Sequence, residues 1–256
     1  MEKNVSQGLP SPNQTPFADL PAALVDEVLE QTSTVAQELL NSFQGIRKER
    51  QSLRTTLEAS GLLISESSLG YPPLPTTCAA DGSYAIERLL TTDLAAAAAV
   101  AVEGLSPPSE ERYWELPRHT SFIAAEPHVE DTATVLRAVM LGEELRLLTS
   151  APHDLVMLDG TLTLPIIYFN QALNNAPDAP QLKCAKSFLE RCIEYLGAYV
   201  TILRAERSDK HYIALPKYST RREIGAELAW PESYDDRGML TMLLNSGELT
   251  KPRPLE

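Results

Sequence analysis

The chain has 256 residues and a mass of 28.2 kDa, enough for one large domain or two small ones with a substantial core. Its 22 Lys and Arg stand against 35 Asp and Glu, and the formal net charge of −13 argues against a protein that coats nucleic acid by bulk attraction. A hydrophobic content of 43% and a charged content of 22% exclude the disordered, collagen-like and coiled-coil classes.

Cysteine usage and the lack of long apolar segments predict a cytoplasmic protein. Cys78, Cys184 and Cys192 form an odd set without a CxxC pair, so we expect neither a disulfide scaffold nor a cysteine zinc site. The first residues contain no apolar leader segment. The longest apolar stretch, residues 94–102, is far shorter than the ~20 residues that span a bilayer. We therefore expect a soluble protein with no membrane contact.

The first 70 residues divide into an arm and a helical region. Residues 1–17 are rich in Pro, Ser, Asn and Gln, which is typical of a flexible N-terminal arm. In residues 18–70, apolar side chains recur at three- and four-residue steps from Leu20 to Ile46, which predicts an amphipathic helix, broken near Gly45. The proline-rich residues 68–75 mark the boundary of the main domain, residues 71–256.

Strand and helix signals alternate through the main domain. Short apolar runs predict strands at 155–158 and 212–215, and apolar periodicity predicts helices at 129–150, 180–198 and 235–244. The alanine-rich residues 94–102 fit a helix or a buried strand equally well. This alternation predicts an α/β fold around a mixed sheet flanked by helices.

Two segments share one design, an apolar strand that ends in Asp-Gly and a hydroxyl residue. They are CAADGS (residues 78–83) and VMLDGT (residues 156–161). If the two strands are neighbours, Asp81 and Asp159 converge at the rim of the sheet, where paired carboxylates can bind a hard cation. Asp-Gly is also a common turn dipeptide, so two ordinary turns remain the alternative. The second segment is similar to a haloacid-dehalogenase phosphatase motif, but Met157 replaces its nucleophilic Asp, which excludes that chemistry.

Glu143 and Glu144 lie in the predicted helix between these strands. Adjacent helical residues point about 100° apart, so we expect only one of them to face the sheet. Glu144 shares its face with Leu141, Leu145 and Leu148, whereas Glu143 is expected to point toward solvent. A solvated salt bridge remains the alternative role for either residue.

Five segments in this order resemble the NurA nucleases, over roughly residues 70–253. They are ADGS, GEELRLL, LVMLDGTL, LPKYSTRREI and DDRGMLTMLLNSGELTKPR. The resemblance implies an RNase H-like fold and a manganese-dependent, two-metal nuclease that acts on DNA ends, with Mg²⁺ as a possible substitute. It also implies a homodimer that works with a hexameric HerA-type ATPase translocase in double-strand break resection or phage defence.

The resemblance also implies the site residues. The metal ligands are expected to be four acids, with Asp235 as the rival of the last one: Asp81, Glu144, Asp159 and Asp236. Such carboxylates suit Mn²⁺ or Mg²⁺, and Lys217 supplies a point charge at the scissile phosphate. The expected DNA-binding residues are that lysine and four residues that follow it in the chain: Lys217, Tyr218, Ser219, Arg221 and Arg222.

One departure from the family keeps other functions open. The family carries a late His that joins the metal site, whereas this sequence ends at GELTKPRPLE. We therefore expect a shortened C-terminal part, either in a fragment of a longer chain or in a short member that completes its site otherwise. The chain could therefore be a non-catalytic adaptor of the same translocase complex with an incomplete metal site. A Mg²⁺-dependent RNase H or integrase-like enzyme on the same fold is a third reading.

Overall fold

The structure, a computed structural model, describes residues 21–70, 73–104, 112–217 and 220–253. The chain forms two compact units, one made of residues 71–219 and one in which residues 1–70 join residues 220–256. The predicted main domain of residues 71–256 thus extends over both units. The predicted arm, residues 1–17, lies outside the described residues.

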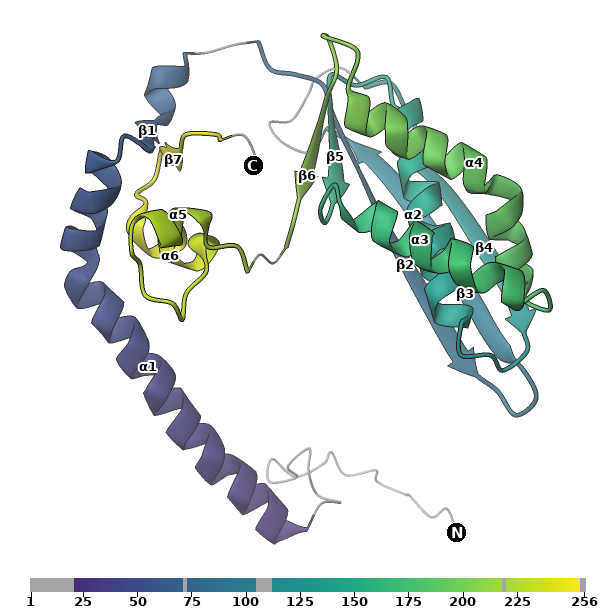
Figure 1. The fold of residues 1–256 in the computed structure, drawn as a ribbon, viewed down its shortest axis with the longest axis horizontal. Helices are drawn as coiled ribbons and strands as arrows, with labels where there is room; N and C mark the ends of the chain where they lie inside the picture. The colour runs from purple at the N-terminus through teal and green to yellow at the C-terminus, as the bar shows by residue number, and fades with distance from the viewer. Residues whose placement is uncertain (1–20, 71–72, 105–111, 218–219, 254–256) are drawn as a thin grey trace, which may run out of the picture. The chain divides into compact units, whose positions relative to one another are not determined.

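A five-stranded mixed sheet forms the centre of the larger unit (Figure 1). Its order is β4-β3-β2-β5-β6, with β2–β3 and β3–β4 antiparallel and β2–β5 and β5–β6 parallel. The strands are β2 (Thr77–Arg88), β3 (Asp93–Glu103), β4 (Arg118–Glu126), β5 (Leu155–Asp159) and β6 (His211–Leu215). The predicted strands at 155–158 and 212–215 are confirmed, whereas β4 was not predicted from the sequence.

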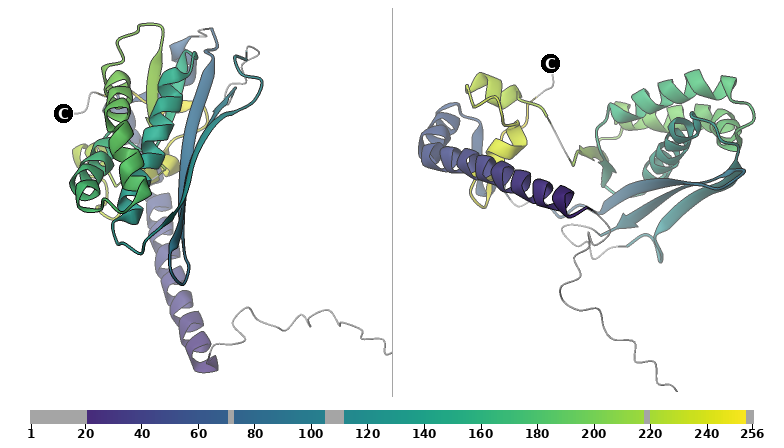
Figure 2. Two further views of the ribbon diagram at one scale, coloured as in Figure 1. Left: turned by 90° about the vertical axis from the view of Figure 1, so that its right-hand side faces the viewer. Right: turned by 90° about the horizontal axis from the view of Figure 1, so that it is seen from below.

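Three helices cover one face of this sheet, as Figure 2 shows. They are α2 (Thr132–Ser150), α3 (Leu164–Asn175), which continues into the 3-10 turn η2 (Ala176–Asp178), and α4 (Lys183–Arg204). Helix α2 packs directly on β2 and β3, and α4 packs on α2. Within this unit, no described helix covers the opposite face of the sheet, which we call the open face.

The alanine-rich segment forms the strand β3. Its residues alternate between buried and more exposed, with Ala95, Ala97, Ala99 and Ala101 buried under the helices. Alanine favours helices, but a burial period of two and pairing on both sides make a strand the better solution here. The small side chains also let α2 approach the sheet closely.

The two Asp-Gly segments differ in the structure. Strand β5 ends at Asp159, and Gly160 follows with a φ of 86°, as predicted for a strand end followed by a turn. Strand β2 instead runs through Asp81 and Gly82 to Arg88, so the prediction that it ends there is wrong. The reason is that β2 pairs with β3 along eleven positions, which the sequence of β2 alone cannot show.

The smaller unit is built on the long helix α1 (Ala22–Ala59), with η1 (Glu66–Leu69), α5 (Glu223–Glu227) and α6 (Asp236–Leu243). Strands β1 (Leu63–Ser65) and β7 (Glu248–Thr250) form an antiparallel pair. Helix α1 continues through Gly45, so the predicted break is wrong. A separate core holds this unit together: Ile46, Leu57, Leu62, Trp230, Met239 and Leu243. None of the helices in the described part of the chain is long and apolar enough to cross a membrane.

Candidate active site

Two neighbouring parallel strands bring Asp81 and Asp159 together on the open face of the sheet. Ala80 of β2 pairs with Leu158 of β5, and the two aspartates are the next residues along. Because successive side chains point to opposite faces and Ala80 and Leu158 are buried under the helices, both aspartates project from the open face. Asp81 is exposed, and 30% of the Asp159 side chain is exposed.

The two aspartates line a cavity of about 440 Å³ on this face. Lys217, just beyond the end of β6, reaches into the same cavity, and its Nζ donates a hydrogen bond to Asp159 Oδ2 at 2.8 Å. This hydrogen bond and the charges of Asp81 and Asp159 raise the pKa of Lys217, so its ammonium group stays charged. Apolar residues form the rest of the lining: Ala79, Ala80, Val100, Val102, Met157, Leu158 and Leu215.

Glu144 reaches the same place from the helix-covered face. Its side chain extends from α2 to Gly82, where a Cβ atom on Gly82 would overlap Glu144 Oε1 and lie 2.8 Å from Met140 Cγ. The backbone of Gly82 also forms a hydrogen bond with the Glu144 carboxylate. A glycine inside a strand often marks such a close approach, and here it lets the carboxylate, only 5% exposed, reach the level of the sheet.

The three acids act on one another electrostatically. Burial is the largest cause that raises the pKa of Glu144, to about 8, and the negative charges of Asp81 and Asp159 add to it. The Gly82 hydrogen bond and the charge of Lys217 act in the opposite direction. Without a bound cation, Glu144 therefore retains its proton at neutral pH.

The donor set suits a hard divalent cation. As the side chains lie, no group of three or more His, Cys, Asp or Glu residues in the described ranges is arranged to hold a metal ion. The chemistry of the donors fits nevertheless, because Asp81, Asp159 and Glu144 offer only carboxylate oxygens, which Mn²⁺ and Mg²⁺ prefer. A cation among them would also remove the repulsion that raises the pKa of Glu144.

Glu143 is buried, so the prediction that it points toward solvent is wrong. Only 4% of the residue is exposed, because α4 packs along α2 at this position. Its carboxylate accepts hydrogen bonds from Tyr195 of α4, at 2.8 Å, and from Arg146, at 2.7 Å. Both members of the acidic pair therefore lie inside the unit, on different sides of α2.

Asp235 and Asp236 belong to the smaller unit, where both have local structural partners. Asp235 caps α6 by accepting a hydrogen bond from the Gly238 backbone N–H at 2.6 Å. The two carboxylate oxygens of Asp236 accept backbone N–H groups of Ile224, at 2.9 Å, and Gly225, at 2.7 Å. These bonds join α6 to the start of α5, and the role of Asp236 as a metal ligand stays a prediction.

The other predicted DNA-binding residues follow Lys217 along the chain. Tyr218 and Ser219 lie outside the described residues. Arg221 forms an ion pair with Glu223 at 2.7 Å. Arg222 donates hydrogen bonds to the carbonyl groups of Trp230, at 3.0 Å, and Tyr234, at 3.1 Å. Arg222 thus has a structural role in the smaller unit, and DNA contact by either arginine stays a prediction.

Two solved structures are similar to this chain. The crystal structure of the NurA nuclease from Sulfolobus solfataricus matches with a TM-score of 0.52 and 14% identity, over 84% of this chain and 67% of that one. A NurA structure bound to dAMP and manganese matches with a TM-score of 0.36 and 17% identity, over 88% of this chain and 58% of that one. The chain thus spans about two thirds or less of these proteins. No curated protein matches it.

The match to the Sulfolobus protein confirms the predicted fold class, a mixed RNase H-like sheet flanked by helices with an N-terminal helix. A family model agrees with it, since the NurA domain matches residues 75–255, well over half of the sequence. The chain therefore belongs to the NurA domain family.

Proposed function

We propose that the chain is a Mn²⁺-dependent deoxyribonuclease of the two-metal type, with Asp81, Glu144 and Asp159 as metal ligands. The observation that carries this proposal is the convergence of Asp81, Asp159 and Lys217 on one cavity, with the Glu144 carboxylate at Gly82, next to Asp81. Membership of the NurA family supports the reaction class. The choice of Mn²⁺ follows the metal named for two NurA structures.

The chain's own groups have distinct tasks in such a reaction. When bound, divalent cations would activate water and stabilise charge on the attacking and leaving oxygens. Lys217, whose side chain is 66% exposed, would bind a non-bridging phosphate oxygen as a point charge. Glu144 must lose the proton that it retains at neutral pH without metal, so metal binding and proton release are coupled.

Asp236 is the fourth ligand of the proposal, as the family resemblance implies. Its present partners are two backbone N–H groups, so its replacement affects the smaller unit as well. Asp236→Asn should be compared with Asp235→Asn, which makes the same charge change at a neighbouring aspartate that also accepts a hydrogen bond from a backbone N–H group. If Asp236 is a ligand, only Asp236→Asn weakens Mn²⁺ binding.

The substrate is DNA, and its ends are delivered by a partner. A protein of net charge −13 has little general attraction for phosphate, so a hexameric HerA-type ATPase that translocates DNA fits as the source of substrate. End resection or phage defence is the corresponding cellular role. Lys217, Arg221 and Arg222, with Tyr218 and Ser219, are proposed to guide the strand at the site.

Helix α1 supports the proposal of a homodimer. Its first 25 residues contain four acids and no base, whereas the basic residues begin at Arg47. Two antiparallel copies of α1 would place the acidic half of each beside the basic half of the other. Large apolar side chains are exposed along the acidic half: Leu24, Val28, Leu29, Val35, Leu39, Leu40 and Phe43. Sedimentation of native and Leu39→Glu chains tests this pairing.

Cleavage of end-labelled single- and double-stranded DNA tests the activity. Native chain, Asp159→Asn and Asp209→Asn are compared with Mn²⁺, Mg²⁺ or EDTA. Asp209 is an exposed aspartate in the same unit whose partner is Arg207, so its replacement is a matched control. Mn²⁺-dependent cleavage that only Asp159→Asn abolishes supports the proposal. No cleavage with or without the ATPase, together with retained ATPase binding, would favour the adaptor.

A further inference from the structure

Three consecutive residues of α2 have different surroundings that together fix the helix. Glu144 points to Gly82 in the sheet, whereas Glu143 points toward α4. Gly142 lies against the ring of Tyr195, where a Cβ atom would overlap the ring carbons. Tyr195 is fully buried. Its ring contacts Gly142, and its hydroxyl donates a hydrogen bond to Glu143.

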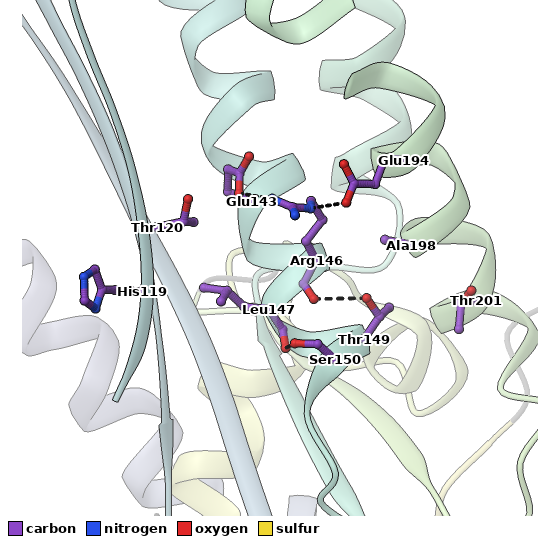
Figure 3. Close-up of a pocket in the computed structure, with 10 residues that line it drawn as sticks. All are labelled: His119, Thr120, Glu143, Arg146, Leu147, Thr149, Ser150, Glu194, Ala198 and Thr201. Atoms are coloured by element: carbon purple, nitrogen blue, oxygen red, sulfur yellow. Dashed lines mark hydrogen bonds and ion pairs between the residues drawn. The ribbon is translucent and has the colours of Figure 1, made fainter. Parts of the chain in front are cut away.

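The Glu143 carboxylate joins three elements. Besides Tyr195, it accepts hydrogen bonds from Arg191 of α4 and from Arg146 of α2 itself, and Thr120 of β4 is a further hydrogen-bond partner. Figure 3 shows Thr120 on the strand side and Arg146 between Glu143 and Glu194. Burial alone would raise the pKa of Glu143, but these partners together lower it, so the carboxylate is ionised at neutral pH.

The network is more than the packing of two helices requires. A buried ion pair seldom adds more stability than well-packed apolar side chains would. The network is also not tightly enclosed, because Glu143 and Arg146 line a cavity of about 640 Å³ (Figure 3). What such a network adds is fixed geometry, because each donor reaches the carboxylate from a set direction. The fixed residue immediately precedes Glu144, and residues of a helix move together.

We propose that Glu143 and Tyr195 are positioning residues. They fix the rotation of α2 about its axis and its position along that axis, so that the Glu144 carboxylate lies at Gly82. The inference rests on the proposed function, because it assigns the network to the metal site. Neither residue would touch metal or DNA. Their loss would leave the three carboxylates present but less well arranged, so metal binding would suffer more than the chemical step.

The test compares Tyr195→Phe and Glu143→Gln with Glu194→Gln. Tyr195→Phe keeps the ring against Gly142 and removes only the hydroxyl. Glu194→Gln is the matched control, because it breaks an ion pair between α2 and α4, from Arg146 to Glu194 at 2.5 Å, and leaves in place every side chain that donates to Glu143. Mn²⁺ affinity is measured by calorimetry, and KM for Mn²⁺, kcat and thermal unfolding in EDTA are measured beside it.

We expect Tyr195→Phe and Glu143→Gln each to weaken Mn²⁺ binding about tenfold, as the loss of a group that orients a metal ligand does. At saturating Mn²⁺, kcat should stay within about twofold of native, because the reacting groups are unchanged. The double variant should bind Mn²⁺ no more weakly than the worse single variant, since both act through one network. Glu194→Gln should match native.

Several outcomes overturn the inference. One is native Mn²⁺ affinity in Tyr195→Phe together with a lower melting temperature, which assigns the network to stability alone. Another is equal loss of affinity in Glu194→Gln. If Tyr195→Phe does not fold, Glu143→Gln decides by the same criteria. Failure of the proposed function looks different, because the native chain itself would then bind no Mn²⁺, and the positioning role falls with it.

Discussion

Replacing Glu144 by Gln should stabilise the metal-free protein. The buried carboxyl has a pKa of about 8 in the folded chain, against 4.5 for an ordinary glutamate. Glutamine has nearly the same shape, carries no charge, and can accept the hydrogen bond of the Gly82 backbone. The variant therefore removes the cost of this acid while the other contacts remain.

The size of the effect follows from proton linkage. Between pH 4.5 and 8 the folded state holds a proton on Glu144 that the unfolded state has released, so stability falls as pH rises, by about 1.4 kcal/mol for each pH unit. At pH 7 the accumulated cost is about 3 kcal/mol. It is absent below pH 4.5 and constant above pH 8. The advantage of Glu144→Gln should therefore grow with pH through this window.

Urea unfolding in EDTA at pH 5, 6, 7 and 8 measures this difference. The chain has two tryptophans, Trp114 in the larger unit and Trp230 in the smaller one, so Trp114 fluorescence in a Trp230→Phe background reports on the unit that contains the site. Glu143→Gln is the control. Its acid has a pKa below the ordinary value of 4.5, so that variant should be less stable than native by an amount that stays the same from pH 5 to pH 8.

Two results would refute the reasoning. One is a native stability that does not fall between pH 5 and 8, and the other is a Glu144→Gln chain less stable than native at pH 7. Mn²⁺ supplies a second check, because a cation that binds only the folded state stabilises it by mass action. Added Mn²⁺ should raise the stability of native chain and much less that of Glu144→Gln.

Three further predictions concern other parts of the chain. Gly82→Ala should destabilise the larger unit by about 1–3 kcal/mol, because its Cβ overlaps Glu144, and it should abolish Mn²⁺ binding. Differential scanning calorimetry measures the loss of stability. Gly197→Ala, in an open helical position, is the control and should be neutral or stabilising in the same measurement. A thiol reagent at pH 8 should label Cys192 first, since burial raises the pKa of the two buried cysteines to about 12; equal labelling by mass spectrometry would contradict this. Hydrogen bonds from Arg54 and from the Asn245 backbone N–H hold the pKa of Glu248 at about 2. The smaller unit should therefore lose stability as pH falls from 4.5 toward 2, and circular dichroism should show a smaller loss in Arg54→Met.

The sequence by itself was enough for the family and for most of the larger unit's elements. Apolar periodicity predicted α2 and α4, and short apolar runs predicted β5 and β6, because the signal for each of these elements lies in its own residues. The motifs around Asp81, Glu144 and Asp159 predicted three acids that the structure brings to one place. A candidate site that depends on residue type at fixed spacing can be proposed without coordinates.

Tertiary structure decided what depends on neighbouring elements. The alanine run is a strand because β2 and β4 pair with it, and β2 passes through Asp81 because β3 supports its full length. Glu143 is buried because α4 covers α2, although its helical position indicated solvent. Gly82 and Gly142 were the available signals, since a glycine inside a strand or helix can mark a close contact, although Gly197 in α4 marks none. The identity of each partner, Glu144 for one and Tyr195 for the other, is set by packing between segments far apart in the chain.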